Sequence, residues 1–195
     1  MTAEAGRGRW PSFAYTGADG WTNARRPPSR APGYRRGVDW VAGVVYAGFL
    51  AGSGALAVID ARTKRLPNRI VFPLYGLGAV GLTLASALGH DWSRLLAAAV
   101  SAALVYGLFW LFWFFGPMGF GDVKLVGVLG LFLGWAGLPA VFIGLILGMF
   151  AATFTALGLM ILRRATLKTE IAYGPYLIGG SWAALAVQAA FALSR

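Results

Sequence analysis

The chain has 195 residues, of which 58% are hydrophobic and only 12% are charged. A soluble domain carries about 25% charged residues, so this composition excludes an ordinary soluble protein and indicates an integral membrane protein. The absence of cysteine excludes disulfides and cysteine-ligated metals, and the single histidine, His90, excludes a multi-histidine site. We therefore expect no metal and no cofactor.

The N-terminal segment differs from the rest of the chain. Residues 1–37 are rich in proline and glycine, hold seven of the 17 Lys and Arg residues, and have no sustained apolar period. This composition predicts a basic, disordered arm. Arginines beside a membrane segment are attracted to anionic lipid, by about 1 kcal/mol each near the surface. We therefore expect membrane lipid as a partner of the arm, and no nucleic acid. Residues 38–195 are predicted to form one membrane-embedded domain.

Apolar runs separated by short polar breaks fill this domain. About 20 residues cross the hydrocarbon of a bilayer. We predict an all-α, polytopic membrane protein with six spans at 39–59, 70–88, 95–115, 124–138, 140–162 and 176–193. Gly134, Gly137 and Pro139 leave the boundary between the fourth and fifth spans poorly defined. Two pairs of glycines with four-residue spacing are expected to pack helices closely, namely Gly48 with Gly52 and Gly144 with Gly148.

Charge alone does not fix the orientation in the membrane. The first, third and fifth breaks hold eight Lys and Arg residues, whereas the opposite side holds two in its breaks and C-terminus plus seven in the arm. Basic residues favour the cytoplasmic side. A count of nine against eight leaves both orientations open.

Two carboxylates stand out by their positions. Asp60 follows the first predicted span and Asp122 precedes the fourth, so counting spans places both at the same membrane face. An ionisable group at such a position is functional or else paired. The paired alternative joins Asp60 to Arg62 or Lys64, and Asp122 to Lys124. Composition leaves these two alternatives equal.

Two carboxylates that share one site cannot easily both ionise, so one becomes a general acid and the other a general base, as in soluble aspartic proteases. Asp122 begins a helix and Asp60 ends one. The helix dipoles therefore predict Asp122 as the base that activates water and Asp60 as the protonated member, although the cations after Asp60 oppose this order. An ion path in a transporter or channel, or a structural membrane partner, remains a competing interpretation.

Three segments carry a family resemblance. Residues 119–125, GFGDVKL, resemble the GxGDxKL signature of type IV prepilin peptidases, which are GxGD aspartic membrane proteases. Residues 60–68, DARTKRLPN, resemble the family's motif of an Asp followed by basic residues and Pro-Asn. Residues 173–180, YGPYLIGG, are similar to the segment before the family's last helix. The resemblance covers about residues 40–193.

The resemblance implies an aspartic endopeptidase that removes the leader peptide from prepilin or pseudopilin substrates of type IV pilus or protein secretion systems. Asp60 and Asp122 would be the catalytic pair at the cytoplasmic face of a bacterial cytoplasmic membrane protein, which places the arm outside. Gly119 and Gly121 would form a flexible turn that lets the backbone approach the pair, a role that suits glycine because it tolerates dihedrals forbidden to other residues. The remaining site-shaping residues implied are Lys124, Pro67, Asn68, Gly174 and Pro175.

The chain departs from many members of that family at one point. Bifunctional members carry a cytoplasmic domain with four zinc-binding cysteines and also methylate the new N-terminus. Here the first two spans are about ten residues apart and cysteine is absent. The short, peptidase-only form is therefore implied. An archaeal preflagellin-like or presenilin-like GxGD protease is the alternative within the class, but the basic run after Asp60 and the Pro67-Asn68 pair favour the bacterial type. The oligomeric state and the particular substrate stay open.

Overall fold

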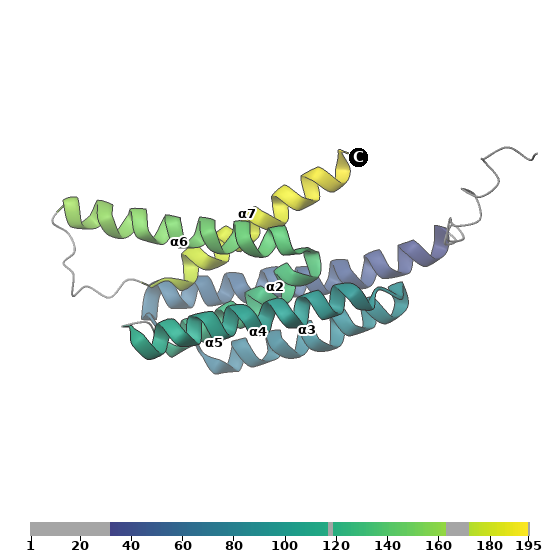
Figure 1. Cartoon of the computed structure of the whole chain (residues 1–195), viewed down its shortest axis with the longest axis horizontal. Coiled ribbons are helices and arrows are strands. Elements are labelled where there is room, and N and C mark those ends of the chain that lie inside the picture. Colours follow the sequence, from purple (N-terminus) through teal and green to yellow (C-terminus); the bar gives the residue numbers. More distant parts are fainter. Residues whose placement is uncertain (1–31, 117–118, 163–171, 195) are drawn as a thin grey trace, which may run out of the picture. The chain divides into compact units, whose positions relative to one another are not determined.

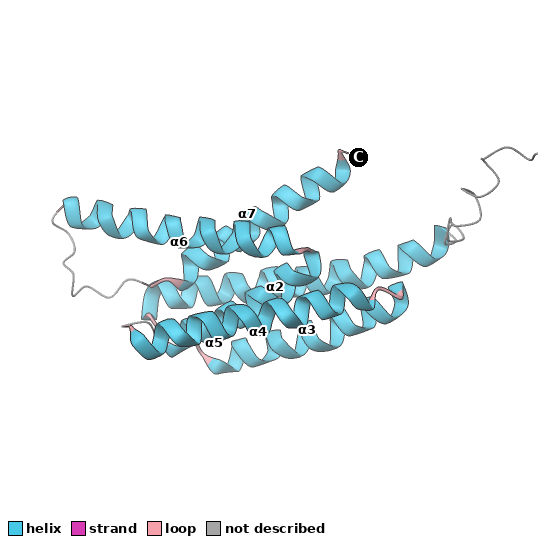
Figure 2. Ribbon diagram, in the orientation of Figure 1, coloured by secondary structure: helices cyan, strands magenta, loops and turns pink. Residues whose placement is uncertain are grey.

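The computed structural model describes residues 32–116, 119–162 and 172–194, which are helical except at helix ends and short links within these ranges (Figures 1 and 2). The helices are α2 Pro32–Thr63, α3 Asn68–Gly89, α4 Trp92–Phe115, α5 Phe120–Ala136, α6 Leu138–Ile161 and α7 Gly174–Leu193. Each predicted span coincides with one of them, which confirms the all-α prediction. Residues 1–31 of the predicted arm and the cations Arg163, Arg164 and Lys168 lie outside the described residues, and α2 begins at Pro32, ahead of the predicted boundary after residue 37.

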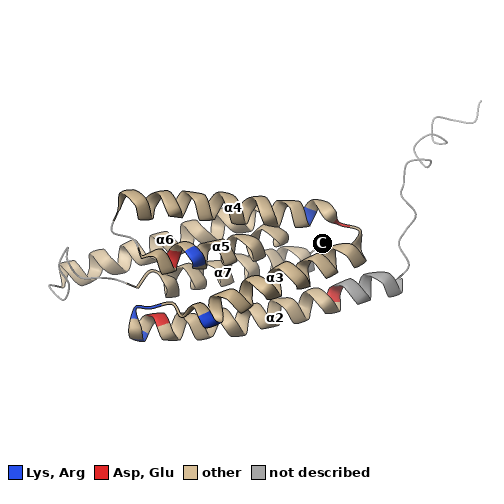
Figure 3. Ribbon diagram, turned by 90° about the horizontal axis from the view of Figure 1, so that it is seen from below, with Lys and Arg blue, Asp and Glu red and all other residues tan. Residues whose placement is uncertain are grey.

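The described helices are suited to lipid. Four segments are long and apolar enough to cross a membrane, namely Asp39–Thr63, Asn68–Gly89, Trp92–Phe115 and Leu138–Ile161. Their charged residues lie toward the helix ends, whereas the long middle of each segment carries none (Figure 3). Large apolar side chains such as Val80, Leu104 and Phe154 are exposed on this middle part. A helix satisfies its own backbone hydrogen bonds, so it is stable in a solvent that offers none. The protein is a polytopic helical membrane protein.

Helix α5 forms the centre of the bundle. It packs against α3, α4, α6 and α7, and nearly all its side chains from Val123 to Trp135 are buried. Its glycines allow very close approach to α4: a Cβ atom on Gly130 would lie 3.0 Å from the Cα of Ala102. Such contacts between backbones restrict sliding of one helix along the other. The first turn of α5, which carries Asp122, is thereby held in place.

The glycine pairs predicted to pack helices do so. A Cβ atom on Gly48 or Gly52 would lie within 2.8 Å of a leucine side chain of α3. On α6, a Cβ atom on Gly144 would lie 3.2 Å from the Cα of a residue in α7, and one on Gly148 would lie 2.8 Å from another. Both pairs therefore join neighbouring helices, which confirms the packing role.

A single residue separates α5 from α6. Gly137 has φ 145° and ψ 152°, and its N–H donates to the carbonyl oxygen of Leu133 at 2.9 Å. A residue with a side chain rarely adopts this φ, so glycine suits the position. This residue is the boundary that the sequence left undefined between the fourth and fifth spans.

Polar side chains tie α2 to its neighbours. The Tyr46 hydroxyl donates to the Phe132 carbonyl oxygen of α5 at 2.7 Å. The Trp182 indole of α7 donates to the Ser53 hydroxyl at 3.1 Å. Buried polar groups in lipid need such partners, and satisfying them restrains the helices that carry them. The C-terminal end of α2, which carries Asp60, is thereby set against α5 and α7.

Candidate active site

Two aspartates from distant parts of the sequence lie near each other at one end of the bundle. Asp60 lies in the last turn of α2 and is only 4% exposed, whereas Asp122 lies in the first turn of α5 and is half-buried. Asp122 precedes the apolar run of α5, outside the four spanning segments. Burial, and secondly the charge of nearby Asp60, raise the pKa of Asp122 to about 7. Proximity of like charges disfavours double ionisation, as expected for a shared site.

Lys124, the predicted partner of Asp122, makes a different contact. It donates through Nζ to the Asn68 side-chain oxygen at 3.1 Å. For Asp122, the functional alternative therefore gains over pairing with Lys124. Another carboxylate, Asp91, forms an ion pair with Arg94 at 3.4 Å.

The start of α7 contacts Asp60 directly. The backbone N–H of Gly174, the first residue of this helix, donates to Oδ2 of Asp60 at 3.1 Å. Gly174 is buried, and a Cβ atom built on it would overlap with that same oxygen. Pro175 follows, and proline supplies no N–H. Residues 173–180, the third segment of the family resemblance, therefore contact Asp60 directly.

Lys124 links the starts of α3 and α5. Besides its hydrogen bond to Asn68, its ammonium group lies 4.9 Å from the ring centroid of Phe120 and 5.5 Å from that of Phe72. A cation over an aromatic face is attracted by the ring quadrupole. Two predicted site-shaping residues, Asn68 and Lys124, are therefore in contact, while Pro67 is the residue that immediately precedes α3.

The two glycines of the GxGD segment lie at the start of α5. Gly119 has φ −71° and ψ 136°, and Gly121 is helical, so neither uses a dihedral forbidden to other residues. The predicted reason for glycine, its tolerance of such dihedrals, is therefore wrong at both positions. Space matters instead, because a Cβ atom on Gly121 would lie 3.3 Å from the Leu66 side chain, and one on Gly119 would lie 3.7 Å from Oδ2 of Asp122. Gly119 accepts a hydrogen bond from the backbone N–H of Asp122 at 3.1 Å.

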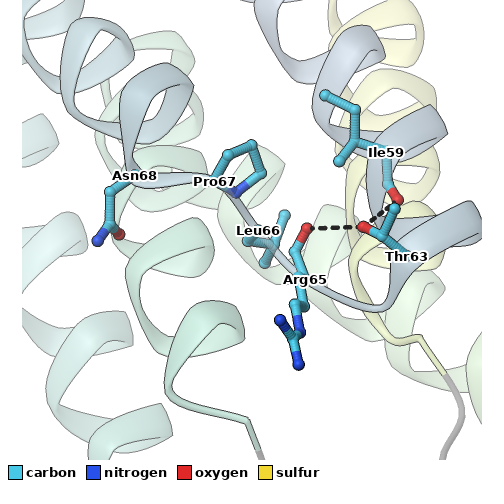
Figure 4. Close-up of a pocket in the computed structure, with 6 residues that line it drawn as sticks. All are labelled: Ile59, Thr63, Arg65, Leu66, Pro67 and Asn68. Carbon is cyan, nitrogen blue, oxygen red and sulfur yellow. Dashed lines mark hydrogen bonds between the residues drawn. The ribbon is translucent and has the colours of Figure 1, made fainter.

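A groove lies along the link between α2 and α3 (Figure 4). Its volume is about 770 Å³. It is lined by Ile59, Thr63, Arg65, Leu66, Pro67 and Asn68. The Thr63 hydroxyl lies 2.8 Å from the Ile59 carbonyl oxygen and 3.3 Å from that of Arg65, which orders the link. The lining therefore combines three apolar side chains, Ile59, Leu66 and Pro67, with three polar ones, Thr63, Arg65 and Asn68.

Sequence reasoning missed two contributors to this site. The Tyr75 hydroxyl donates to the Lys124 carbonyl oxygen at 2.9 Å and so fixes the first turns of α5 against α3. A phenol within an apolar span needs a polar partner, which was the available signal. Leu66 packs against Gly121, and no sequence pattern indicated that contact.

The fold and the site together define a helical membrane protein with a carboxylate pair at one end of its bundle. The chain belongs to the type IV leader peptidase family, which matches residues 47–161. No solved structure matches the chain.

Curated relatives agree with this family. The chain is 32% identical over 134 residues to a prepilin leader peptidase/N-methyltransferase of Aeromonas hydrophila, covering 67% of this chain and 45% of that protein. It is 32% identical over 152 residues to the protein of that name from Pseudomonas aeruginosa, covering 76% and 51% respectively. The corresponding protein of Dickeya chrysanthemi is 35% identical over 151 residues, covering 72% and 50%. The chain thus spans about half the length of these relatives.

Proposed function

We propose that this protein is an aspartic endopeptidase that cleaves the leader peptide from prepilin or pseudopilin substrates. The observation that carries the proposal is that Asp60 and Asp122 lie at one end of the helical bundle, where burial and the nearby charge of Asp60 raise the pKa of Asp122 to about 7. Two carboxyl groups that titrate apart supply a base and an acid at neutral pH. The names of the relatives, prepilin leader peptidase/N-methyltransferase, support this substrate class.

The reaction divides into two steps. The ionised carboxylate takes a proton from water, whose oxygen attacks the scissile carbonyl carbon, while the protonated carboxyl gives its proton to the carbonyl oxygen. The resulting diol then collapses. Its C–N bond breaks, the leaving amine takes the proton held by the base, and a diol hydroxyl returns a proton to the other carboxylate. Both carboxyl groups end in their starting states.

The surrounding residues would position the substrate. The groove along the link between α2 and α3 offers both apolar and polar side chains, which suits an extended peptide segment. Pro67, Asn68 and Lys124 would shape that groove, and Gly119, Gly121, Gly174 and Pro175 would set the backbone around the pair. The chain would be a multi-pass protein of the bacterial cytoplasmic membrane, with the pair at the cytoplasmic face. Its arm would be residues 1–31 and its peptidase domain residues 32–195, because α2 begins at Pro32.

Transport is the less favoured function. Ion and substrate sites of transporters lie near the bilayer midplane, in broken helices. Asp60 and Asp122 instead lie in the terminal turns of their helices. A purely structural partner would leave the contact between the family's three motifs without a purpose.

The test is co-expression with candidate prepilins in membranes, with loss of the leader measured by mass spectrometry. Asp60→Asn and Asp122→Asn should each abolish cleavage while the protein still inserts and folds. Asp91→Asn is the matched control, because this exposed carboxylate pairs with Arg94 away from the site. Cleavage at the wild-type rate in either Asp60→Asn or Asp122→Asn would contradict the proposal.

A further inference from the structure

We propose that the N-terminus of α7 positions Asp60. The Gly174 N–H donates to Oδ2 of Asp60 and keeps this carboxylate ionised, so that Asp60 acts as the base. This inference rests on the proposed function. It reverses the order of roles that the helix ends of α2 and α5 alone predict. Gly174 itself would touch neither water nor substrate, and would act through Asp60.

The hydrogen bond between Gly174 and Asp60 satisfies groups that, within the described residues, would otherwise lack a partner. The first N–H groups of a helix have no partner within that helix. Gly174 is the first residue of α7, and its N–H finds a partner in Asp60 across 114 positions of the sequence. Asp60 is almost fully buried, so this bond replaces hydration that the carboxylate has lost. A hydrogen bond to an ionised acceptor is about twice as strong as one between neutral groups.

The dipole of α7 adds to this bond. The start of a helix carries about half a positive charge, which favours a carboxylate there. The end of α2 carries the opposite partial charge, but the α7 end reaches the carboxylate directly, through a donor at 3.1 Å. From the sequence, α2 and α5 are the helices that end or begin at the two aspartates, and the dipole of α7 is not visible there. With α7 included, the balance at Asp60 moves toward the ionised form.

The other charged and titratable groups at this end fit the same order. In the described residues they are Arg62, Lys64 and Arg65 beyond Asp60, Arg69 on α3, Asp122 and Lys124 on α5, and Tyr173 and Tyr176 at the start of α7. The four arginine and lysine residues on α2, its link and α3 are exposed, so water screens them, yet their sign also favours ionised Asp60. Asp122 repels a second negative charge, and its pKa of about 7 lets it hold a proton up to neutral pH.

Glycine at position 174 is required by space and not by backbone conformation. Gly137 is the glycine with a positive φ among the described residues, so alanine fits the backbone at 174. Its methyl group, however, would overlap with Oδ2 of Asp60. Gly174→Ala therefore moves the carboxylate and breaks the hydrogen bond without removing any charged group. Gly179→Ala, on the same helix, places a methyl group where nothing lies within 4 Å and is the matched control.

The experiment measures cleavage against pH for purified wild-type, Gly174→Ala and Gly179→Ala proteins, with folding checked by thermal unfolding in detergent. For Gly174→Ala we expect kcat to fall about 100-fold with KM little changed, because misplacement of about 1 Å costs about that much. The acidic limb of its rate profile should move up by about one pH unit, because an ionised base loses a charge-assisted donor. Gly179→Ala should match wild type. A kcat and pH profile of Gly174→Ala equal to those of wild type would overturn the inference.

A second measurement does not depend on the folding of Gly174→Ala. Infrared difference spectra across pH report which carboxyl is protonated near neutral pH. The protonated band should vanish in Asp122→Asn and persist in Asp60→Asn; the reverse would overturn the assignment of Asp60 as base. Failure of the proposed function would give a different result, namely cleavage at the wild-type rate in either Asp60→Asn or Asp122→Asn.

Discussion

Gly148→Ala should disturb the candidate active site indirectly, through the packing of α6 against α7. Gly148 lies in the middle of α6, on the face against α7. A methyl group there would lie 2.8 Å from the Cα of Leu177 and 2.9 Å from the carbonyl oxygen of Tyr176, both of which are backbone atoms. Backbone cannot rotate away as a side chain can, so α7 must move.

The size of that movement follows from the distances. Ordinary van der Waals contact begins at 3.4 Å, so α7 must retreat by about 0.6 Å at Leu177, one turn beyond Gly174. A similar shift at Gly174 would lengthen its 3.1 Å bond to Asp60 to about 3.7 Å, which is no longer a hydrogen bond. We expect cleavage to fall about 10- to 100-fold and the free energy of unfolding to fall by about 1–3 kcal/mol.

The assay combines leader cleavage in detergent with unfolding followed by circular dichroism. Gly158→Ala is the control on the same helix, because nothing lies within 4 Å of a Cβ atom at that position. It should retain full cleavage and unfold no earlier than wild type. If Gly148→Ala behaved like Gly158→Ala in both assays, the reasoning from helix packing to site geometry would be refuted.

Three further predictions concern charge and metal. Because burial and Asp60 raise the pKa of Asp122 from 3.8 to about 7, the folded protein holds an extra proton between these values, and its free energy of unfolding should fall as pH rises from about 4 to about 7. Denaturant titrations should show this slope in wild type and a weaker one in Asp122→Asn; equal slopes would contradict the shift. Lys124→Ala and Asn68→Ala should be coupled by about 0.5–1.5 kcal/mol in a double-mutant cycle of unfolding, because they share a hydrogen bond, whereas additive effects would show that the bond contributes nothing. Cleavage should survive strong chelators, since the chain has no cysteine and one histidine; loss restored by zinc would disprove this.

Much of the fold follows from the sequence alone. Each described helix coincides with an apolar run bounded by polar or glycine-rich breaks, because a helix is the structure that satisfies its own backbone in lipid. Counting these runs also placed Asp60 and Asp122 at one end of the bundle, since helices that cross a bilayer alternate in direction. The motifs around them then predicted the family.

The tertiary structure alone decided how these residues touch. Helix ends were visible in the sequence, but which end meets which carboxylate depends on the packing of α7 against α2, and Gly174 and Asp60 are 114 positions apart. The contact of Lys124 with Asn68 and the approach of Leu66 to Gly121 likewise join separate helices and links. A sequence pattern reports local periodicity, whereas the electrostatics of a buried carboxylate depend on every helix end and charge around it. The sequence therefore determined which two carboxylates form the candidate site, and only the packing decided how Asp60 is held.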